Sequence, residues 1–163
     1  MSERAIATLA GGCFWGVDEL IRKLDGVTRT TAGYTGGDLE NPTYDDVKTG
    51  RSGHAEAVEV EFDPAVISYE EILRYFFRLH DPTTLNQQGN DRGTQYRSAI
   101  FYHDQDQGET AERVKAEVDS SGKWNRPVVT EIVPAKTFWK AETEHQDYLQ
   151  RYPWGYNCHY LRE

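Results

Sequence analysis

The order in which strand-like and helix-like segments follow one another is the feature that most limits how this chain can fold. Apolar, β-branched or alternating residues mark the strands that we predict at residues 5–10, 27–34, 56–62, 96–102 and 128–133. Helical periodicity or capping residues mark the helices that we predict at residues 13–24, 69–77, 104–118 and 139–149. Several connections are too short for parallel crossovers. The pattern therefore predicts an α+β fold, a two-layer α/β sandwich with a ferredoxin-like core, rather than a doubly wound sheet.

A chain of 163 residues is long enough for one domain with a real hydrophobic core. We expect residues 1–163 to form a single catalytic domain, with residues 150–163 as an irregular tail. Two long polar loops interrupt the predicted elements, at residues 36–54 and 81–94. Loops of that length in a compact domain are usually functional or disordered, so both are candidates to line a site.

The formal net charge of -9 at pH 7 argues against nucleic acid or an anionic membrane surface as a main partner, because such contacts need clustered Lys and Arg. The N-terminal segment MSERAIATLAGG has no long apolar run, so we expect neither a signal peptide nor a membrane span. We therefore expect a cytoplasmic protein. The two cysteines, Cys13 and Cys158, suggest thiol chemistry in a reducing compartment more than structural cross-linking.

Cys13 follows two glycines and stands at the start of a predicted helix. The unpaired backbone N–H groups and the dipole at a helix N-terminus favour a thiolate, which is the reactive form of cysteine. The alternative, a buried cysteine that acts as a small hydrophobe, stays open. Phe14 lies on the apolar face of this helix and Trp15 lies off it, so Trp15 either lines a pocket beside the thiol or packs at the surface.

Glu56 opens a strand with clean alternation, EAVEVEF. Residues two apart in a strand share a face, so Glu56 lies on the same side as Val58, Val60 and Phe62. Burial there would raise the pKa of its carboxyl and make it a proton donor near neutral pH. In the alternative reading, the strand has barely begun at Glu56 and the side chain reaches solvent.

Two spacings resemble parts of metal sites. His54-x-Glu56 is like the start of a zinc deaminase motif, but the chain has no C-x-x-C to complete it. Glu142-x-x-His145 has the spacing of a carboxylate metal site, which needs a second copy and further glutamates, so a structural pair is the better reading. We predict no metal. Cys158 lies in a tail that contains Pro and Gly, and it is either a thiol that closes a disulfide or a bystander.

Five separated motifs, in order over nearly the whole chain, resemble the A-type peptide methionine sulfoxide reductases. They are Gly12-Cys13-Phe14-Trp15-Gly16, Gly53-His54-Ala55-Glu56, Gln88-Gly89-Asn90-Asp91, Gln95-Tyr96-Arg97-Ser98, and Ala141-Glu142 followed by His145-Gln146 and Tyr148-Leu149. The resemblance implies reduction of the S epimer of methionine sulfoxide, free or within proteins, as repair of oxidative damage. It also implies a two-layer α/β core with ferredoxin-like features.

The resemblance assigns the chemistry to five side chains. Cys13 would be the nucleophile that attacks the sulfoxide sulfur and becomes a sulfenic acid. Glu56 would protonate the sulfoxide oxygen. Tyr44 and Tyr96 would donate hydrogen bonds to that oxygen, and Asp91 would help to order the polar site.

The remaining roles that the resemblance implies concern binding and recycling. Phe14 and Trp15 would hold the methyl group of the substrate. Cys158, in the tail, would be the resolving cysteine that forms a disulfide with Cys13. Thioredoxin or another dithiol would then restore both thiols, so we expect no cofactor, and we expect a monomer.

Two rival functions remain at the level of sequence. A cysteine hydrolase also places its cysteine at a helix start, and the five histidines of the chain could supply a base. A small acidic binding module with an aromatic groove would need no catalytic thiol. Deoxygenated product would distinguish the reductase from the hydrolase, and any turnover would exclude the binding module.

Overall fold

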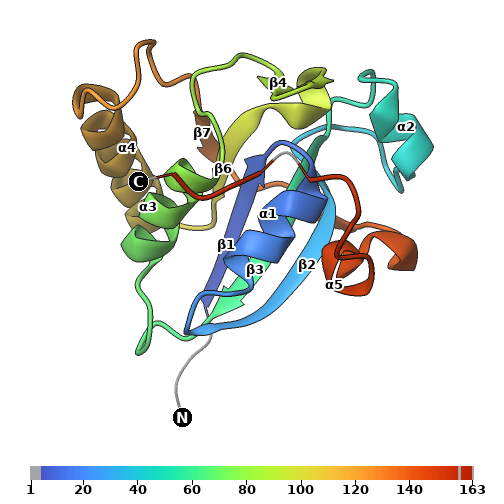
Figure 1. Ribbon diagram of the computed structural model, residues 1–163, viewed down its shortest axis with the longest axis horizontal. Helices are drawn as coiled ribbons and strands as arrows, with labels where there is room; N and C mark the ends of the chain where they lie inside the picture. Colours follow the sequence, from blue (N-terminus) through green and yellow to red (C-terminus); the bar gives the residue numbers. More distant parts are fainter. Residues whose placement is uncertain (1–4, 158, 163) are drawn as a thin grey trace.

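The computed structural model describes residues 5–157 and 159–162. Six strands of this part of the chain form one sheet in the order β7-β6-β1-β3-β2-β8 (Figure 1). Adjacent strands run antiparallel except for β6 and β7, which are parallel. The strands are β1 (Ala5–Gly11), β2 (Val27–Thr35), β3 (Ala55–Phe62), β6 (Ser98–Tyr102), β7 (Glu131–Pro134) and β8 (Trp139–Lys140).

The four central strands form two interleaved βαβ units. Helix α1 (Phe14–Ile21) connects β1 to β2, with β3 between them in the sheet. Helix α3 (Tyr69–Leu79) lies between β3 and β6 in sequence, and β1 lies between those strands in the sheet. This is the ferredoxin-like arrangement, and it confirms the predicted fold class. Helix α4 (Gln105–Ser120) follows β6 and leads to the parallel strand β7.

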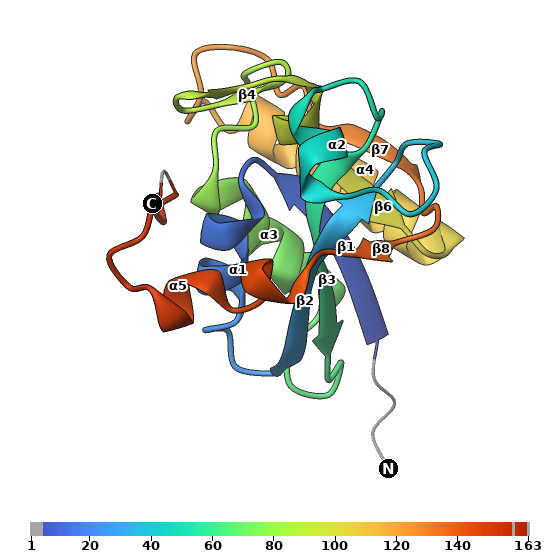
Figure 2. The ribbon, with the colours of Figure 1, turned by 90° about the vertical axis from the view of Figure 1, so that its right-hand side faces the viewer.

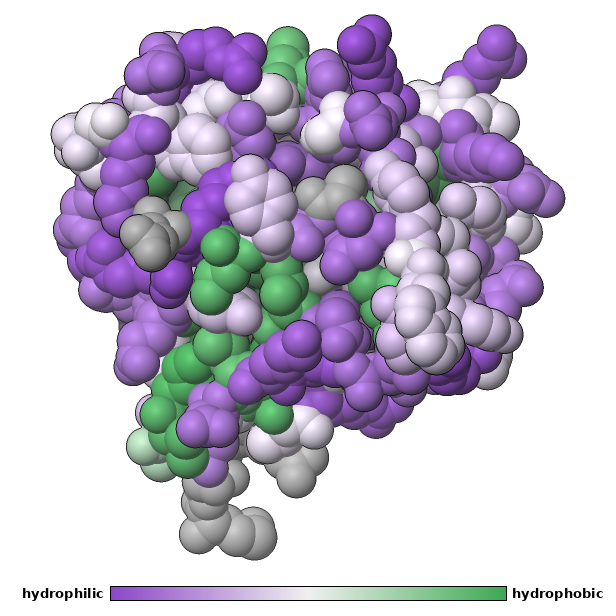
Figure 3. Space-filling model, viewed as in Figure 1, coloured by the Kyte–Doolittle hydropathy of each residue, from purple (hydrophilic) through white to green (hydrophobic). Residues whose placement is uncertain are grey.

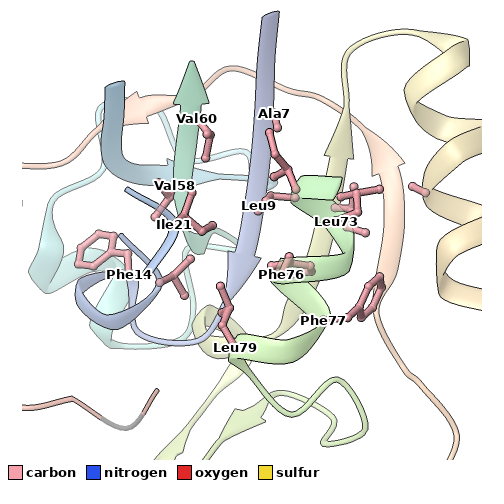
Figure 4. Packing of buried hydrophobic residues seen from close by; sticks show 14 of the residues in the cluster. Ala7, Leu9, Phe14, Ile21, Val58, Val60, Leu73, Phe76, Phe77 and Leu79 are labelled. Atoms are coloured by element: carbon pink, nitrogen blue, oxygen red, sulfur yellow. The ribbon is translucent and has the colours of Figure 1, made fainter. Parts of the chain in front are cut away.

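The main core lies between the sheet and the pair of helices α1 and α3, which share one side of the sheet (Figure 2). Apolar side chains at helical spacing on α1 and α3 meet alternate residues of β1 and β3, because each element buries its apolar face against the other layer. Figure 4 shows this contact, with labelled residues from all four elements and with Phe77 on the side of α3 away from α1: Ala7, Leu9, Phe14, Ile21, Val58, Val60, Leu73, Phe76, Phe77 and Leu79.

The opposite face of β3 follows the predicted alternation. Ala55 and Ala57 are buried in a second, smaller cluster with Ala99 and Phe101, which residues 133–138 partly cover. Glu56 therefore lies on the face of β3 that packs against the helices, together with Val58, Val60 and Phe62, as period-2 alternation predicts.

Several predicted boundaries hold and others shift. Ser68 and Glu71 form a capping box directly before Tyr69, where the helix was predicted to begin, and Asp104 caps α4 through the backbone N–H of Gln107. Helix α1 ends at Ile21, three residues before the predicted end. Strand β6 starts two residues later than predicted and β7 three residues later.

The predicted helix at residues 139–149 is wrong. Trp139 and Lys140 pair with the edge of β2 as β8, so the segment begins as a strand. A 3-10 turn (Thr143–His145) and the short helix α5 (Tyr148–Arg151) follow, separated by Asp147 with φ 54. A left-handed residue interrupts helical hydrogen bonding, which explains why one continuous helix does not form.

The two long loops contain short elements. Residues 36–54 include helix α2 (Tyr44–Lys48), which begins with a capping box between Thr43 and Asp46. Residues 81–94 include the two-residue strands β4 (Gln87–Gln88) and β5 (Asp91–Arg92). Hydrophilic side chains cover most of the face seen in Figure 3, apart from an apolar strip at lower left. Among the described residues, we find no helix with the length and apolarity needed to cross a bilayer.

Candidate active site

Cys13 is placed at the junction between β1 and α1. It is the N-cap residue of α1, directly before the helical residue Phe14, and its side chain is 8% exposed. Gly12 makes the turn with φ 98, a conformation that favours glycine. Cys13 therefore lies at the positive end of the α1 dipole, an environment that favours a thiolate.

Glu56 lies beneath the same helix end. Its side chain is 1% exposed, and its Oε1 accepts a hydrogen bond of 3.2 Å from the backbone N–H of Phe14. Burial raises the pKa of Glu56 to about 8, the Phe14 N–H partly offsets this, and nearby Asp91 raises it further. The prediction that Glu56 is buried on the apolar face is confirmed. At neutral pH its carboxyl is largely protonated, as a proton donor must be.

Tyr44, Tyr96 and Asp91 reach the same neighbourhood from three short loop elements. Tyr44 begins α2, Tyr96 ends the 3-10 turn before β6, and Asp91 lies in β5. Burial raises the pKa of Tyr44 to about 12, and Glu56, Cys13 and Asp91 add to the shift. Burial likewise raises the pKa of Tyr96, followed by the effect of Glu56. Both phenols are therefore protonated at neutral pH and able to donate hydrogen bonds.

Aromatic rings line one side of this neighbourhood. The indole N–H of Trp15 donates to Nδ1 of His145 at 3.2 Å, and the indole stacks on Tyr148 with a centroid distance of 3.9 Å. The ring of His145 lies 4.4 Å from that of Tyr44 and 5.5 Å from that of Phe14, between centroids. Trp15 is thus held in an aromatic wall next to the thiol, rather than packed at a remote surface.

Glu142 fixes a second part of the site. Its Oε1 accepts from the hydroxyl of Tyr34 and its Oε2 from the backbone N–H of Tyr44, both at 2.9 Å. Sequence reasoning treated Glu142 and His145 as a helical pair and gave them no role. In the structure Glu142 directly precedes a 3-10 turn and His145 ends it, and they hold Tyr44 and Trp15 respectively. The signal that could have found them was their place in the fifth motif.

The residues whose spacings resemble parts of metal sites make hydrogen bonds within the protein. The ligand-type atoms of Glu142, Glu144 and His145 lie within 4.8 Å of one another, but both oxygens of Glu142 and Nδ1 of His145 take part in hydrogen bonds. His54 is buried, with Nδ1 accepting from Gly37 N–H and Nε2 donating to the carbonyl of Leu39. His54 therefore shapes a loop.

Cys158 lies outside the described residues. Its sequence neighbours Asn157 and His159 are described, and both lie against the start of α1: a Cβ on Gly16 would come within 2.6 Å of Asn157 Oδ1 and 2.3 Å of His159 Nδ1. The eight predicted site residues thus divide into seven that the structure brings together around α1 and one that it does not describe.

Comparisons with known proteins agree with this geometry. A sequence model of a family described as peptide methionine sulfoxide reductase matches residues 5–163. The chain is 59% identical over 162 residues to the peptide methionine sulfoxide reductase MsrA of Leifsonia xyli subsp. xyli (strain CTCB07), with coverage of 99% of this chain and 92% of that relative.

Solved structures give the same result. Mxr1 from Saccharomyces cerevisiae in reduced form superimposes with a TM-score of 0.93 at 40% identity, over 99% of this chain and 93% of the yeast chain. The yeast protein in complex with Trx2 matches with a TM-score of 0.67 at 31% identity, over 99% of this chain and 91% of that chain. Both the sequence and the fold similarities therefore span nearly the full length.

Proposed function

This chain belongs to the peptide methionine sulfoxide reductase family, and we propose that Cys13 is the nucleophile of its reaction. The enzyme reduces methionine-S-sulfoxide to methionine. One observation carries the assignment of residues: the thiol at the start of α1 and the buried carboxyl of Glu56 share the same helix end, joined through the Phe14 N–H. That pairing supplies a nucleophile and an acid to one substrate.

The first step transfers the sulfoxide oxygen to Cys13. The sulfur of Cys13 attacks the sulfoxide sulfur, methionine leaves with two electrons, and Cys13 becomes a sulfenic acid. Negative charge develops on the sulfoxide oxygen during this step. Protonated Glu56 can supply a proton there, and the hydroxyls of Tyr44 and Tyr96 can donate hydrogen bonds, while Asp91 helps to order these polar groups.

The aromatic wall supports recognition of the substrate. The ring of Trp15 is partly exposed beside the thiol and that of Phe14 is buried next to it, and these apolar surroundings suit the methyl group of methionine sulfoxide. The hydrogen bond of Trp15 to His145 and its stacking on Tyr148 keep this surface in place. Binding through the methyl group would orient the sulfur toward Cys13 and the oxygen toward Glu56.

The second step closes a disulfide between Cys13 and Cys158, which a dithiol protein such as thioredoxin then reduces. The complex of the yeast relative with Trx2 supports this partner. Because the electrons come through thiols, we propose that no cofactor is needed. We further propose one catalytic domain over residues 1–163, with residues 150–163 as the tail that carries Cys158, and a cytoplasmic monomer. One continuous sheet and its shared core support the single domain.

The test counts methionine formed per enzyme. Cys13→Ser should form none, and retained turnover would remove Cys13 from its role. Cys158→Ser should form about one methionine per enzyme and then stop, because the sulfenic acid has no resolving thiol. Continued cycling with thioredoxin in Cys158→Ser would mean a different resolving route. A cysteine hydrolase, the enzyme alternative that the sequence left open, has no support in the comparisons.

A further inference from the structure

The residues on either side of Cys158, Asn157 and His159, lie against the start of α1. His159 is 6% exposed, and its Nε2–H donates to the carbonyl oxygen of Gly11 at 2.7 Å. A carbonyl can only accept, so this nitrogen carries the proton. The backbone N–H of His159 also donates to Oδ1 of Asn157 at 2.9 Å. In Figure 1 the dark-red C-terminal segment crosses the N-terminal end of α1, which agrees with these contacts.

Gly16 provides an independent sign of this attachment. It lies in the first turn of α1, where alanine is the better helix former. A Cβ at Gly16 would lie 2.3 Å from Nδ1 of His159 and 2.6 Å from Oδ1 of Asn157, closer than atoms can approach. The hydrogen bond to Gly11 prevents the His159 ring from simply moving aside. Gly16, the second glycine of the Gly12-Cys13-Phe14-Trp15-Gly16 motif, therefore leaves the space that the His159 ring occupies.

The tail is also held on both sides of His159. After it, the backbone N–H of Arg162 donates to the carbonyl of Arg78 at 2.8 Å, and Nε–H of Arg78 donates to the carbonyl of Arg162 at 2.6 Å. Before it, the side-chain N–H of Gln150 donates to Glu19 of α1, at 2.7 Å to Oε2 and 2.9 Å to Oε1. His159 is thus the middle attachment of a segment tied to both helices of the helical layer.

We propose that His159 is a positioning residue for the second step: it holds the tail so that Cys158 meets the sulfenic acid of Cys13. This inference rests on the proposed function, because it needs Cys158 as the resolving thiol. In that step the Cys158 sulfur attacks the Cys13 sulfur, the S–S bond forms as the S–O bond breaks, and the thiol proton leaves with the hydroxyl as water. Cys13 was already oxidised by the sulfoxide, so no other oxidant is involved.

The proposal assigns His159 to the second step alone, through its bond to the Gly11 carbonyl, so its loss should separate the two steps. Removing an attachment leaves Cys158 on a looser tether and lowers its effective concentration at Cys13. Fully reduced, full-length enzyme is mixed with excess free methionine sulfoxide and quenched at intervals. Methionine reports the first step, and mass spectrometry of the Cys13–Cys158 disulfide reports the second.

In His159→Ala the first methionine should form at the rate of the unaltered chain. The disulfide should form about tenfold more slowly or worse, and dimedone should trap Cys13 sulfenic acid that the unaltered chain does not accumulate. Trp154→Ala is the control, because Trp154 also belongs to the tail and is 94% exposed. It should leave both steps unchanged.

Gly16→Ala tests the same contact from the helix side. Alone it should slow disulfide formation, because the new Cβ displaces the His159 ring. In combination with His159→Ala it should add less than it costs alone, since the His159 ring is gone and only Asn157 Oδ1 remains for the new Cβ to displace. Additive losses would contradict the proposal, and so would equal slowing of both steps in His159→Ala, which would mean that His159 supports the Cys13 helix instead.

Cys158→Ser is measured in parallel to keep the two hypotheses apart. If Cys158→Ser continues to cycle with thioredoxin, the resolving step of the proposed function is wrong. If Cys158→Ser stops after one turnover while His159→Ala forms its disulfide at the normal rate, only the role of His159 is wrong.

Discussion

Among single residues, Glu56 has the sharpest consequence for activity. It must be protonated to act as an acid, and burial raises its pKa to about 8. The rate of methionine formation in a single turnover should therefore fall as the pH rises through about 8. Glu56→Gln should lower this rate by about 100-fold and should lose this alkaline limb, because the amide does not titrate in this range. Rapid-quench measurements between pH 6 and 10 test this expectation.

Glu59→Gln is the control for Glu56→Gln, because Glu59 lies in the same strand on the other face and is half-buried. It should keep both the rate and the pH limb. An alkaline limb that survives in Glu56→Gln would mean that another group is the acid.

His145 should affect binding more than chemistry. Its Nδ1 accepts a hydrogen bond from the indole N–H of Trp15. His145→Leu removes this acceptor, so the Trp15 ring that we assign to the substrate methyl group is held less firmly. A hydrogen bond is worth about 1 kcal/mol, which corresponds to an increase of about fivefold in KM with a smaller change in the single-turnover rate. His145→Asn can keep an acceptor in a similar place and should recover part of the loss. A fall in rate with an unchanged KM would argue against this role.

The residues of the site differ in how far the sequence could predict them. Cys13 and Glu56 were predictable from local pattern, because a helix start and strand alternation fix where their side chains lie. Tyr44, Tyr96 and Asp91 were not, because they come from irregular segments whose placement depends on tertiary contacts; only the resemblance to a family singled them out. The contact of His159 with α1 was also not predictable, because it joins residues about 150 positions apart in the sequence.

Among elements, the capping boxes of α2 and α3 make a matched pair. Thr43 caps α2, whose first residue is Tyr44, whereas Ser68 caps α3 in the helical layer. Either change to Ala removes the side-chain acceptor of the helix N-terminus and should cost about 1 kcal/mol locally. Thr43→Ala should also lower the single-turnover rate, because Tyr44 loses its support. Ser68→Ala should lower only the free energy of unfolding, measured in urea. Equal activity of the two variants would contradict the role of Tyr44.

The elements that sequence patterns predicted best are those with one buried face. Strand β3 and helix α3 have strict apolar periodicity and a turn or cap at the boundary, so their types and positions agree closely with prediction. Residues 139–149 were mispredicted because β8 exists only through pairing with the edge of β2. A two-residue strand has no periodicity of its own. Helix α2 is also too short to show a helical period, so the sequence predicted only a loop there.

For the whole molecule, the topology explains how Cys13 and Glu56 come together. Strands β1 and β3 are antiparallel neighbours at the centre of the sheet. The end of β1, which leads to Cys13, therefore lies at the same edge as the beginning of β3, which carries Glu56. The two predicted catalytic groups are fixed by the best-paired part of the fold, and the loops supply the remaining groups around them.

The buried titratable groups together predict how the stability of the molecule depends on pH. Burial lowers the pKa of His80 to about 3 and that of His159 to about 4, from 6.5. Below pH 6.5 the unfolded chain therefore binds more protons than the folded chain, and the free energy of unfolding falls as the solution becomes more acidic. Glu56 acts in the opposite sense, because its pKa is raised from 4.5 to about 8. Its contribution to stability is lost as the pH rises toward about 8.

Between pH 4.5 and 6.5 the effect of the two histidines outweighs that of the one glutamate, so the free energy of unfolding should rise with pH. Above pH 6.5 only the glutamate of these three groups still titrates, so the free energy of unfolding should fall. Urea unfolding across pH 4 to 9 should therefore give a maximum near pH 6.5. In Glu56→Gln the decline between pH 6.5 and 8 should disappear, and the rise between pH 4.5 and 6.5 should become steeper, because the two histidines are then unopposed. If that decline persists in the variant, the carboxyl of Glu56 is already ionised in the folded enzyme at neutral pH, and it then has no proton to give to the sulfoxide oxygen.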